Sequence, residues 1–317
     1  MLKKPKLLAV VGPTASGKSA LAEELAARLG GEIVSCDSMQ IYRGMDIGTA
    51  KPTQEARARV PYHLIDVAEP SSDFSVVEYC TAAKEAVDDI LSRKRLPIFC
   101  GGTGLYLDTF LRGTPASPGS DPQLRRELTA LAEMHGNLYL HEELQRVDPE
   151  SARAIHPGNL RRVIRALEIY RATGITKTEW DRRSREQPLA YDATVLYLTF
   201  RDRTLLYRRI EARVLEMIEA GLVEETARLK AAGVFELSRT AAAAIGYKEL
   251  LPYLAGACTL PEAVEQLKMA TRRYAKRQIT WFSARPYVTP LAVDHDGKLR
   301  KFEEIVNNAM GYLSKEV

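Results

Sequence analysis

The sequence predicts an α/β protein in which a parallel sheet is flanked by helices and an all-helical domain is inserted into the chain. Three observations lead to this prediction. Short apolar runs alternate with helical patterns through the first hundred residues, a run rich in glycine and proline interrupts them at 113–120, and helical patterns follow it. Because parallel strands need a crossover connection, strand–helix–strand spacing of this kind indicates a parallel sheet.

The first predicted element is an apolar strand over 7–11. A helix then begins near Gly17, carries leucines at four-residue spacing and closes at Gly30. Leucines at this spacing share one face of a helix, and glycine is the usual residue just past a helix C-terminus. The remaining elements predicted in this part are strands over 32–36 and 96–100 and a crossover helix over 75–91.

The run from Gly113 to Ser120 contains too many breakers to form a helix or strand, so we predict a domain boundary there. Asp121 and Pro122 then provide the N-cap and first-turn proline of a helix that extends to Gly136, and a second capped helix is predicted over 159–174. These boundaries predict a core domain of residues 1–120 and 191–317 and a helical insertion of residues 121–190.

After the insertion, a strand over 193–200 is predicted to return to the sheet. A helix begins at Asp202, and the residues after it are expected to be mostly helical. The first of these helices has an apolar stripe made of Ile210, Val214, Met217 and Ile218.

Composition excludes several classes of protein. The 317 residues are 45% hydrophobic and 27% charged, which argues against disorder and coiled coil, and the formal charge of +4 does not by itself identify a nucleic-acid partner. The four cysteines form no C-x-x-C pair, so we predict neither a zinc site nor a disulfide framework. Free cysteines are typical of a reducing compartment, so we predict a cytoplasmic location. No apolar run approaches the roughly 18 residues that span a bilayer, so no membrane partner is expected.

The clearest motif is a G-x-x-x-x-G-K-S phosphate loop between the first strand and the first helix. It predicts a P-loop NTPase-like core, because backbone N–H groups and the helix N-terminus attract an anion, lysine adds a cation and serine can bind Mg²⁺. The alternative is a chance glycine-rich turn, which the flanking strand and helix disfavour. The motif consists of Gly12, Pro13, Thr14, Ala15, Ser16, Gly17, Lys18 and Ser19.

Two further segments are predicted at the same edge of the sheet. Asp37 follows the strand over 32–36, where it can serve as a base, as a metal ligand or only as a capping residue. The strand over 96–100 ends in Gly101 to Gly104 rather than in the carboxylate of a Walker B strand, which counts against ATP hydrolysis. This turn either brings the Thr103 hydroxyl to the site or serves only to reverse the chain.

Basic residues form two clusters. Nine Lys or Arg lie between Arg153 and Arg185 against three acidic residues, with Arg161, Arg162 and Arg165 close together on one predicted helix. Such a stripe suits a phosphate backbone, although it is also typical of a solvated helix face. The second cluster has basic residues at four-residue spacing and comprises Lys268, Arg272, Arg273, Lys276 and Arg277. Gln278, Trp281 and Phe282 follow it. These three residues are compatible with RNA contact or with docking of the helix on the core.

Taken together, the motifs resemble those of the tRNA dimethylallyltransferase family across nearly the whole chain. The long run from Asp37 to Pro52 is the most specific to that family, whereas the phosphate loop is generic. The other matching segments are Gly101 to Tyr106, Arg161 to Glu168, Ile245 to Tyr247 and Ala275 to Phe282.

The resemblance implies transfer of a dimethylallyl group from dimethylallyl diphosphate to N6 of the adenine immediately 3′ of the tRNA anticodon. The phosphate loop, Arg213 and a Mg²⁺ ion on Ser19 would then hold the leaving diphosphate, while Asp37 accepts the amine proton and Thr103 lies near the reacting centre.

The resemblance also implies a set of tRNA contacts to an anticodon stem-loop from which one nucleotide is extruded. Asp37, Ser38, Met39, Gln40 and Thr103 would surround the target base. The insertion would contact the RNA through Arg125, Arg126, Arg161, Arg162, Val163, Ile164 and Arg165.

This chain departs from the family pattern before Ile245, where the family usually has a longer polar or methionine-bearing side chain and this chain has Ala241 to Ala244. A tRNA contact there is therefore not predicted. The alternatives to a tRNA prenyltransferase are a P-loop small-molecule or nucleoside kinase that binds ATP, an adenylate prenyltransferase, and an RNA-binding module with a structural phosphate loop. A monomer is expected, since no association helix is evident.

Overall fold

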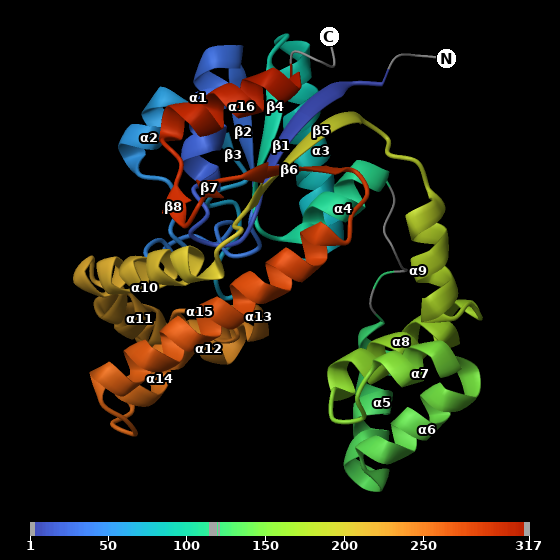
Figure 1. Ribbon diagram of the computed structural model, residues 1–317. Helices are drawn as coiled ribbons and strands as arrows, with labels where there is room; N and C mark the ends of the chain where they lie inside the picture. Colours follow the sequence, from blue (N-terminus) through green and yellow to red (C-terminus); the bar gives the residue numbers. More distant parts are fainter. Residues whose placement is uncertain (1–3, 114–118, 120, 314–317) are drawn as a thin grey trace. The chain divides into compact units, whose positions relative to one another are not determined.

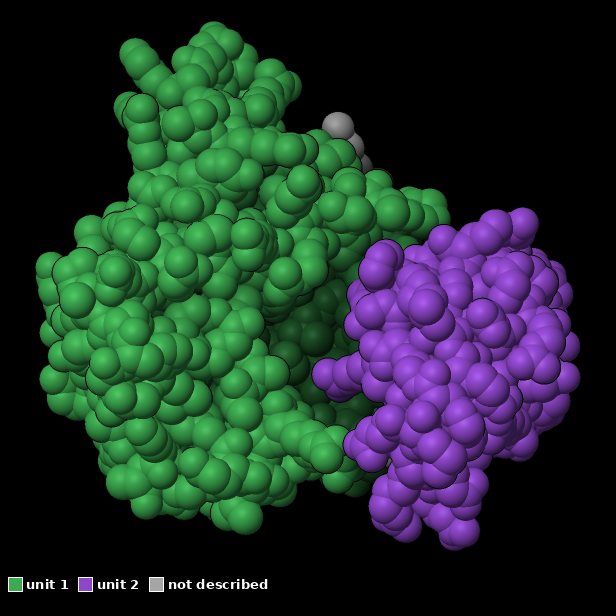
Figure 2. All heavy atoms as spheres, turned by 90° about the horizontal axis from the view of Figure 1, so that it is seen from below, with its two compact units in different colours: residues 1–111, 191–317 green, residues 112–190 purple. Residues whose placement is uncertain are grey.

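A computed structural model describes residues 4–113, 119 and 121–313, and the chain divides into two compact units (Figure 2). The first, which we call the core unit, comprises residues 1–111 and 191–317, and the second, the helical unit, comprises 112–190. The predicted insertion began at residue 121. The helical unit begins earlier, at Arg112, whose guanidinium donates to the carbonyls of Arg185 and Gln187. Most of the predicted boundary run, 114–118 and 120, lies outside the described residues.

A six-stranded sheet in the order β3-β2-β4-β1-β5-β6 forms the centre of the core unit, and each neighbouring pair is parallel (Figure 1). The predicted parallel sheet is therefore confirmed. Its strands are β1 Lys6–Val11, β2 Gly31–Cys36, β3 Tyr62–His63, β4 Leu96–Gly101, β5 Asp192–Thr199 and β6 Val288–Ala292.

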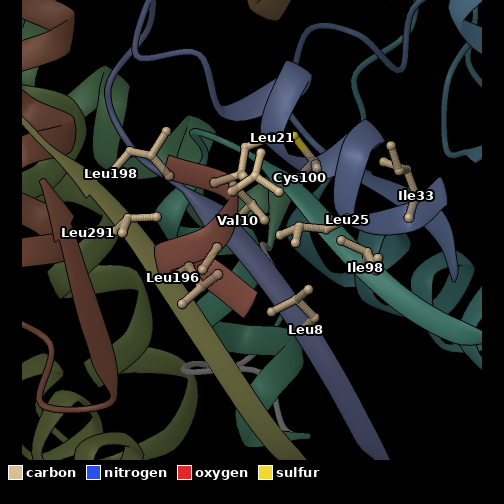
Figure 3. Packing of buried hydrophobic residues seen from close by; sticks show 14 of the residues in the cluster. Leu8, Val10, Leu21, Leu25, Ile33, Ile98, Cys100, Leu196, Leu198 and Leu291 are labelled. Atoms are coloured by element: carbon tan, nitrogen blue, oxygen red, sulfur yellow. The ribbon is translucent and has the colours of Figure 1, made fainter. Parts of the chain in front are cut away.

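Helices cover both faces of this sheet. On one face, α1 (Lys18–Leu29) and α16 (Phe302–Leu313) pack over leucine and valine side chains of the strands. Figure 3 shows this cluster, in which Leu8, Leu25 and Leu196 are almost completely buried. The other face carries α3 (Val76–Ser92) and α4 (Gly104–Arg112). Alternation along β1 explains the two layers, because Leu8 and Val10 point to the first face and Ala9 to the second.

Capping residues place the predicted helices as expected. Ser75 and Glu78 form a capping box at the start of α3, and the Asp202 side chain caps α10 (Arg203–Glu219). Gly30 ends α1 with φ 63°. The core unit also contains α2 Gln54–Arg59, α10 Arg203–Glu219, α11 Leu222–Ala231, α12 Val234–Leu237, α13 Arg239–Ala242, α14 Tyr247–Leu254 and α15 Leu260–Ser283.

The expectation that the chain is mostly helical after residue 202 is confirmed, but this part also contains an unpredicted strand, β6, which joins the sheet beside β5. Pro290 lies inside this strand, and the strand was not predicted because a proline interrupts the sequence pattern typical of strands. A proline is tolerated there because β6 is an edge strand, where one N–H needs no ladder partner. The small hairpin of β7 (Asp294–His295) and β8 (Lys298–Leu299) was not predicted either.

The helical unit contains the two predicted helices, with Asp121 and Pro122 at the start of the first and Gly174 after the last turn of the second. The buried side chains of this unit form a separate core, which includes Leu128, Leu140 and Leu167. The helices of this unit are α5 Pro122–His135, α6 Asn137–Val147, α7 Pro149–Ala154, α8 Leu160–Thr173 and α9 Lys177–Glu186.

Among the described residues, none of the helices combines the length and apolar character that crossing a membrane requires.

Candidate functional site

The phosphate loop connects β1 to α1, as the motif predicts. Ala15 and Gly17 both have left-handed backbone, with φ of 61° and 91°, and Gly17 caps α1 at a position where other residues would be strained. The Ser16 N–H donates to the Pro13 carbonyl at 3.2 Å, and the Lys18 amine lies 3.4 Å from that carbonyl oxygen. The loop thus places Lys18 and the start of α1 at the carboxyl end of the sheet.

Three charged side chains from distant segments meet beside this loop. Lys18 from α1, Asp37 from the turn after β2 and Arg213 from α10 all line one small cavity of about 60 Å³. Ser19 and Gln40 line the same cavity. The structure therefore brings together the predicted diphosphate-binding cations and the predicted base, although these residues are far apart in the sequence.

The two cations are held in an environment that favours an anion. Burial, together with the positive charge of Arg213, lowers the pKa of the Lys18 amine. Burial likewise lowers the pKa of Arg213, while the negative charge of Asp37 opposes this effect. The negative charge of a bound diphosphate would offset the positive charges of Lys18 and Arg213, so both side chains would bind it strongly.

Lys18, Ser19 and Arg213 also line a larger cavity of about 950 Å³. Residues 46–54 and α10 supply most of its remaining wall, including Arg209. Its size is at the upper end of the range for small-molecule sites. The phosphate loop is therefore accessible to a ligand such as an organic diphosphate.

The turn that carries Asp37 is tied to the turn after β4. The Thr103 hydroxyl accepts a hydrogen bond from the Ser38 N–H at 3.0 Å, and the Thr103 N–H donates to the Cys36 carbonyl at 3.1 Å. Asp37 Oδ1 accepts the Met39 N–H at 2.9 Å, and within the described residues no hydrogen bond is made to Oδ2. One carboxylate oxygen thus holds the turn while the other can take a proton.

The neighbouring predicted residues have different surroundings. Gln40 donates to the carbonyls of Thr49 and Ala50 and accepts from the Ser35 hydroxyl, so its amide ties two loops together at the cavity wall. Met39 packs against the apolar cluster formed by α10, α11, α14 and α15. Its side chain supports the turn and does not line the cavity beside Asp37.

A buried carboxylate on α11 holds the loop that follows. Glu225 accepts hydrogen bonds from the N–H groups of Asp46, Ile47 and Gly48 at 3.0–3.1 Å and from the Tyr247 hydroxyl at 2.7 Å. A side chain at Gly48 would collide with the Tyr247 ring at 2.5 Å. This packing gives a structural reason for two of the motif segments, the one around Gly48 and the one ending at Tyr247.

Three residues that the sequence analysis did not assign to the site contact it. Arg209 donates to the Ala15 carbonyl at 2.7 Å, and Gln278 from α15 accepts the Thr14 N–H at 2.8 Å. Tyr274 lines the small cavity, where burial and the charge of Asp37 raise the pKa of its hydroxyl. Arg209 could have been found from its spacing, since it lies one helical turn before Arg213.

The predicted Mg²⁺ site rests on few protein groups. Among the described residues, no group of three or more His, Cys, Asp or Glu side chains could hold a metal ion. Ser19 and Asp37 nevertheless offer oxygen atoms at the same cavity. This set fits Mg²⁺, which commonly takes one or two protein oxygens and completes its shell with phosphate and water.

Two predicted tRNA-binding arginines in the helical unit share one buried carboxylate. Glu168, which is 1% exposed, accepts from Arg125 at 2.9 Å and from Arg165 at 2.8 Å, and it also accepts the Asp121 N–H. Although burial opposes ionisation, the hydrogen bonds from Arg165 and Arg125 lower the pKa of Glu168. Glu168 therefore fixes both guanidinium groups while leaving them partly exposed.

The other predicted contacts in the helical unit fall into two groups. Arg126, Arg161 and Arg162 are exposed and available to a phosphate backbone. Val163 and Ile164 are buried in the core of the unit, at 0% and 6% exposure. The prediction that these two residues contact tRNA is wrong for their side chains, because the apolar face of α8 that carries them packs inward.

The second basic cluster lies on α15, which also has one buried face and one exposed face. Ala275, Gln278 and Phe282 are buried, so this face docks the helix on the core unit. Arg272 pairs with Glu211 at 2.5 Å. The exposed face of the helix carries Arg273, Lys276 and Arg277.

Known proteins resemble the chain over nearly its full length. A family model described as IPP transferase matches residues 40–285, and one described as isopentenyl transferase matches residues 5–62. A tRNA dimethylallyltransferase from Caldanaerobacter subterraneus is 46% identical over 313 residues, with 98% of both chains covered. The solved tRNA isopentenylpyrophosphate transferase of Bacillus halodurans is 44% identical with a TM-score of 0.70, covering 98% of each chain. A eukaryotic dimethylallyltransferase acting on tRNA has a TM-score of 0.80 at 27% identity, covering 98% of this chain and 80% of its own.

Proposed function

This chain belongs to the tRNA dimethylallyltransferase family, and on that premise we propose that it alkylates N6 of the adenine immediately 3′ of the tRNA anticodon. The chain is a prenyltransferase that acts on tRNA, and the family favours this activity over a kinase. Dimethylallyl diphosphate is the proposed donor, and diphosphate is released. The observation that carries the proposal is the meeting of Lys18, Arg213 and Asp37 at one cavity beside the phosphate loop.

The phosphate loop is proposed to hold the leaving group. As the bond between the dimethylallyl carbon and the diphosphate oxygen breaks, negative charge accumulates on the diphosphate. Lys18 and Arg213 lie where they can stabilise that charge, and their partial burial strengthens the interaction. Two N–H groups of the loop, those of Thr14 and Ser16, are already bound within the protein, so the anion would rely on the N–H groups at the start of α1.

Asp37 is proposed to accept the proton of the adenine amine while the new C–N bond forms. The amine is a weak nucleophile because its lone pair is delocalised into the ring, so removal of a proton assists the attack. Asp37 Oδ1 is bound to the Met39 N–H, which leaves Oδ2 for this task. Thr103 would orient the reacting base through the turn that it shares with Ser38.

Mg²⁺ would be held by Ser19 and the diphosphate, with Asp37 nearby. When bound, it would neutralise charge on the diphosphate oxygens. This assignment is part of the proposal and can be tested by titrating Mg²⁺ in the transfer assay.

Both units are proposed to contribute to tRNA binding. In the helical unit, Arg125 and Arg165 are oriented by Glu168, and Arg126, Arg161 and Arg162 are exposed. Such contacts to phosphates would set the position of the RNA, whereas contacts to the target base would specify it. We further propose that the enzyme works as a cytoplasmic monomer, since one chain carries all the groups named here.

The test is a transfer assay with purified protein, Mg²⁺, dimethylallyl diphosphate and an unmodified tRNA bearing adenine 3′ of the anticodon. Digested nucleosides are analysed by mass spectrometry, and a parallel reaction contains ATP in place of the prenyl donor. We expect a dimethylallyl adduct on that adenosine alone. Phosphate transfer from ATP to an acceptor, without any adduct, would contradict the proposal.

Arg165→Ala is expected to weaken tRNA binding by about tenfold, because a charge-assisted contact to a phosphate is lost. The slope of log Kd against log salt concentration should also become shallower by about one. Arg28→Ala is a matched control, since Arg28 is similarly exposed, at 34% against 28%, and pairs with Glu24 and Glu303 on the core unit. Equal binding by both variants would remove Arg165 from the tRNA site.

A further inference from the structure

Gln278 on α15 is buried between two loops of the site. Its side-chain oxygen accepts the Thr14 N–H at 2.8 Å, and its side-chain nitrogen donates to the Gly102 carbonyl at 3.1 Å. The residue is 4% exposed. Both ends of one amide are therefore used, one on the phosphate loop and the other on the turn after β4.

The turn after β4 is built to receive this amide. A Cβ atom at Gly102 would lie 1.9 Å from the Gln278 nitrogen, which is far inside contact distance. At the neighbouring Gly101, a Cβ would lie 2.0 Å from the Cys36 carbonyl oxygen. Two adjacent glycines thus allow the turn to press against Gln278 on one side and the end of β2 on the other.

The same turn holds the proposed base. Thr103, next to Gly102, binds the Cys36 carbonyl through its N–H and the Ser38 N–H through its hydroxyl. Asp37 lies between Cys36 and Ser38, so both of its chain neighbours are anchored to Thr103. A continuous set of hydrogen bonds and peptide links therefore runs from the phosphate loop through Gln278 to the turn that carries Asp37.

We propose that Gln278 is a positioning residue that sets the spacing between the phosphate loop and Asp37, an inference that rests on the function proposed above. In the transfer, the C–N bond forms as the C–O bond to diphosphate breaks, and the amine proton passes to Asp37. Leaving group, carbon, nitrogen and base must therefore be aligned at one moment. A displacement of about 1 Å in such an alignment can cost about 100-fold in rate.

The surroundings of Gln278 suit this role. The helix that carries it is 24 residues long, and Ala275 and Phe282 on the same helix are buried, so its position is well supported. The amide is neutral and leaves the positive field of Lys18 and Arg213 unchanged. A glutamate here would still accept the Thr14 N–H but would set a carboxylate against the Gly102 carbonyl.

The decisive experiment compares the wild-type enzyme with Gln278→Met, whose side chain has a similar length but forms no hydrogen bonds to the two loops. At saturating tRNA and dimethylallyl diphosphate, we expect the single-turnover rate to fall about 30- to 100-fold. The Kd values for inorganic diphosphate and for tRNA, each measured separately, should change by less than about threefold. A loss of single-turnover rate with unchanged binding is the signature of misalignment.

Two further variants make the result independent of one substitution. Gly102→Ala should displace the Gln278 amide from the other side and reproduce the loss of rate. Thr280→Val on the same helix is the control, since within the described residues the Thr280 hydroxyl hydrogen-bonds to the Lys276 carbonyl of its own helix and to no other group, and it should retain the full rate. Thermal unfolding of each variant identifies any that fails to fold.

An unchanged single-turnover rate in both Gln278→Met and Gly102→Ala would overturn the inference, and so would a loss explained wholly by weaker diphosphate or tRNA binding. Either result would leave the proposed function intact, because the unmodified enzyme would still prenylate tRNA. Failure of the unmodified enzyme to form the adduct would instead contradict the proposed function itself.

Discussion

Asp37→Asn is expected to lower the rate of the transfer step by about 100- to 10,000-fold, because general-base catalysis contributes a factor of this size. The amide keeps an oxygen for the Met39 N–H and so preserves the turn, but it cannot take the amine proton. Single-turnover prenylation at saturating substrates measures the effect. Asp37→Ala should be at least as severe, since it also removes the hydrogen bond that shapes the turn.

The matched control for Asp37 is Asp88→Asn, which removes a carboxylate from the exposed face of α3, where it pairs with Lys84. This variant should prenylate tRNA at the full rate. If Asp37→Asn also retained full turnover, Asp37 would have no role as a base, and the adenine proton would have to leave by another route.

Lys18→Ala is expected to lower turnover by about 100- to 1,000-fold, the cost of removing one group that stabilises developing charge. Lys18 is partly buried, lines the same small cavity as Arg213 and lies at the start of α1, where the leaving diphosphate is proposed to sit. The affinity for inorganic diphosphate, measured by calorimetry, should fall together with the rate. Lys84→Ala, which removes an exposed lysine from α3, should change neither quantity.

The pH dependence of diphosphate binding provides a second test of Lys18. Burial and the charge of Arg213 lower the pKa of its amine, and only the protonated amine attracts the anion. Affinity should therefore be fully present below that pKa and decline as the pH rises through it. In Lys18→Arg, which stays charged, this decline should disappear. An identical decline in both proteins would assign the titration to another group.

Much of the fold could be predicted because its signals are local. The Gly30 cap, the apolar strand over 7–11 and the proline of the first insertion helix each depend on a few neighbouring residues. The edge strand β6 was missed since Pro290 breaks the local pattern, and only its pairing with β5 reveals it.

The candidate site could be predicted only in part. The glycine and lysine of the phosphate loop are specified by backbone geometry and charge, so their role can be read from the motif itself. Val163 and Ile164 were assigned to tRNA with their arginine neighbours, yet helical geometry turns them into the core of the helical unit. A contiguous motif does not separate the residues that touch a ligand from those that support them.

The sequence by itself determined the phosphate loop, the parallel sheet, the helical insertion and the family, because each depends on short patterns or on order along the chain. Only the tertiary structure decided which distant groups meet. Gln278 reaches the phosphate loop from a helix 264 residues away, Glu225 holds the loop at Asp46 to Gly48, and Glu168 gathers Arg125 and Arg165. The physical reason is that a buried polar side chain must satisfy its hydrogen bonds, and its partners are supplied by packing between elements rather than by neighbours in sequence.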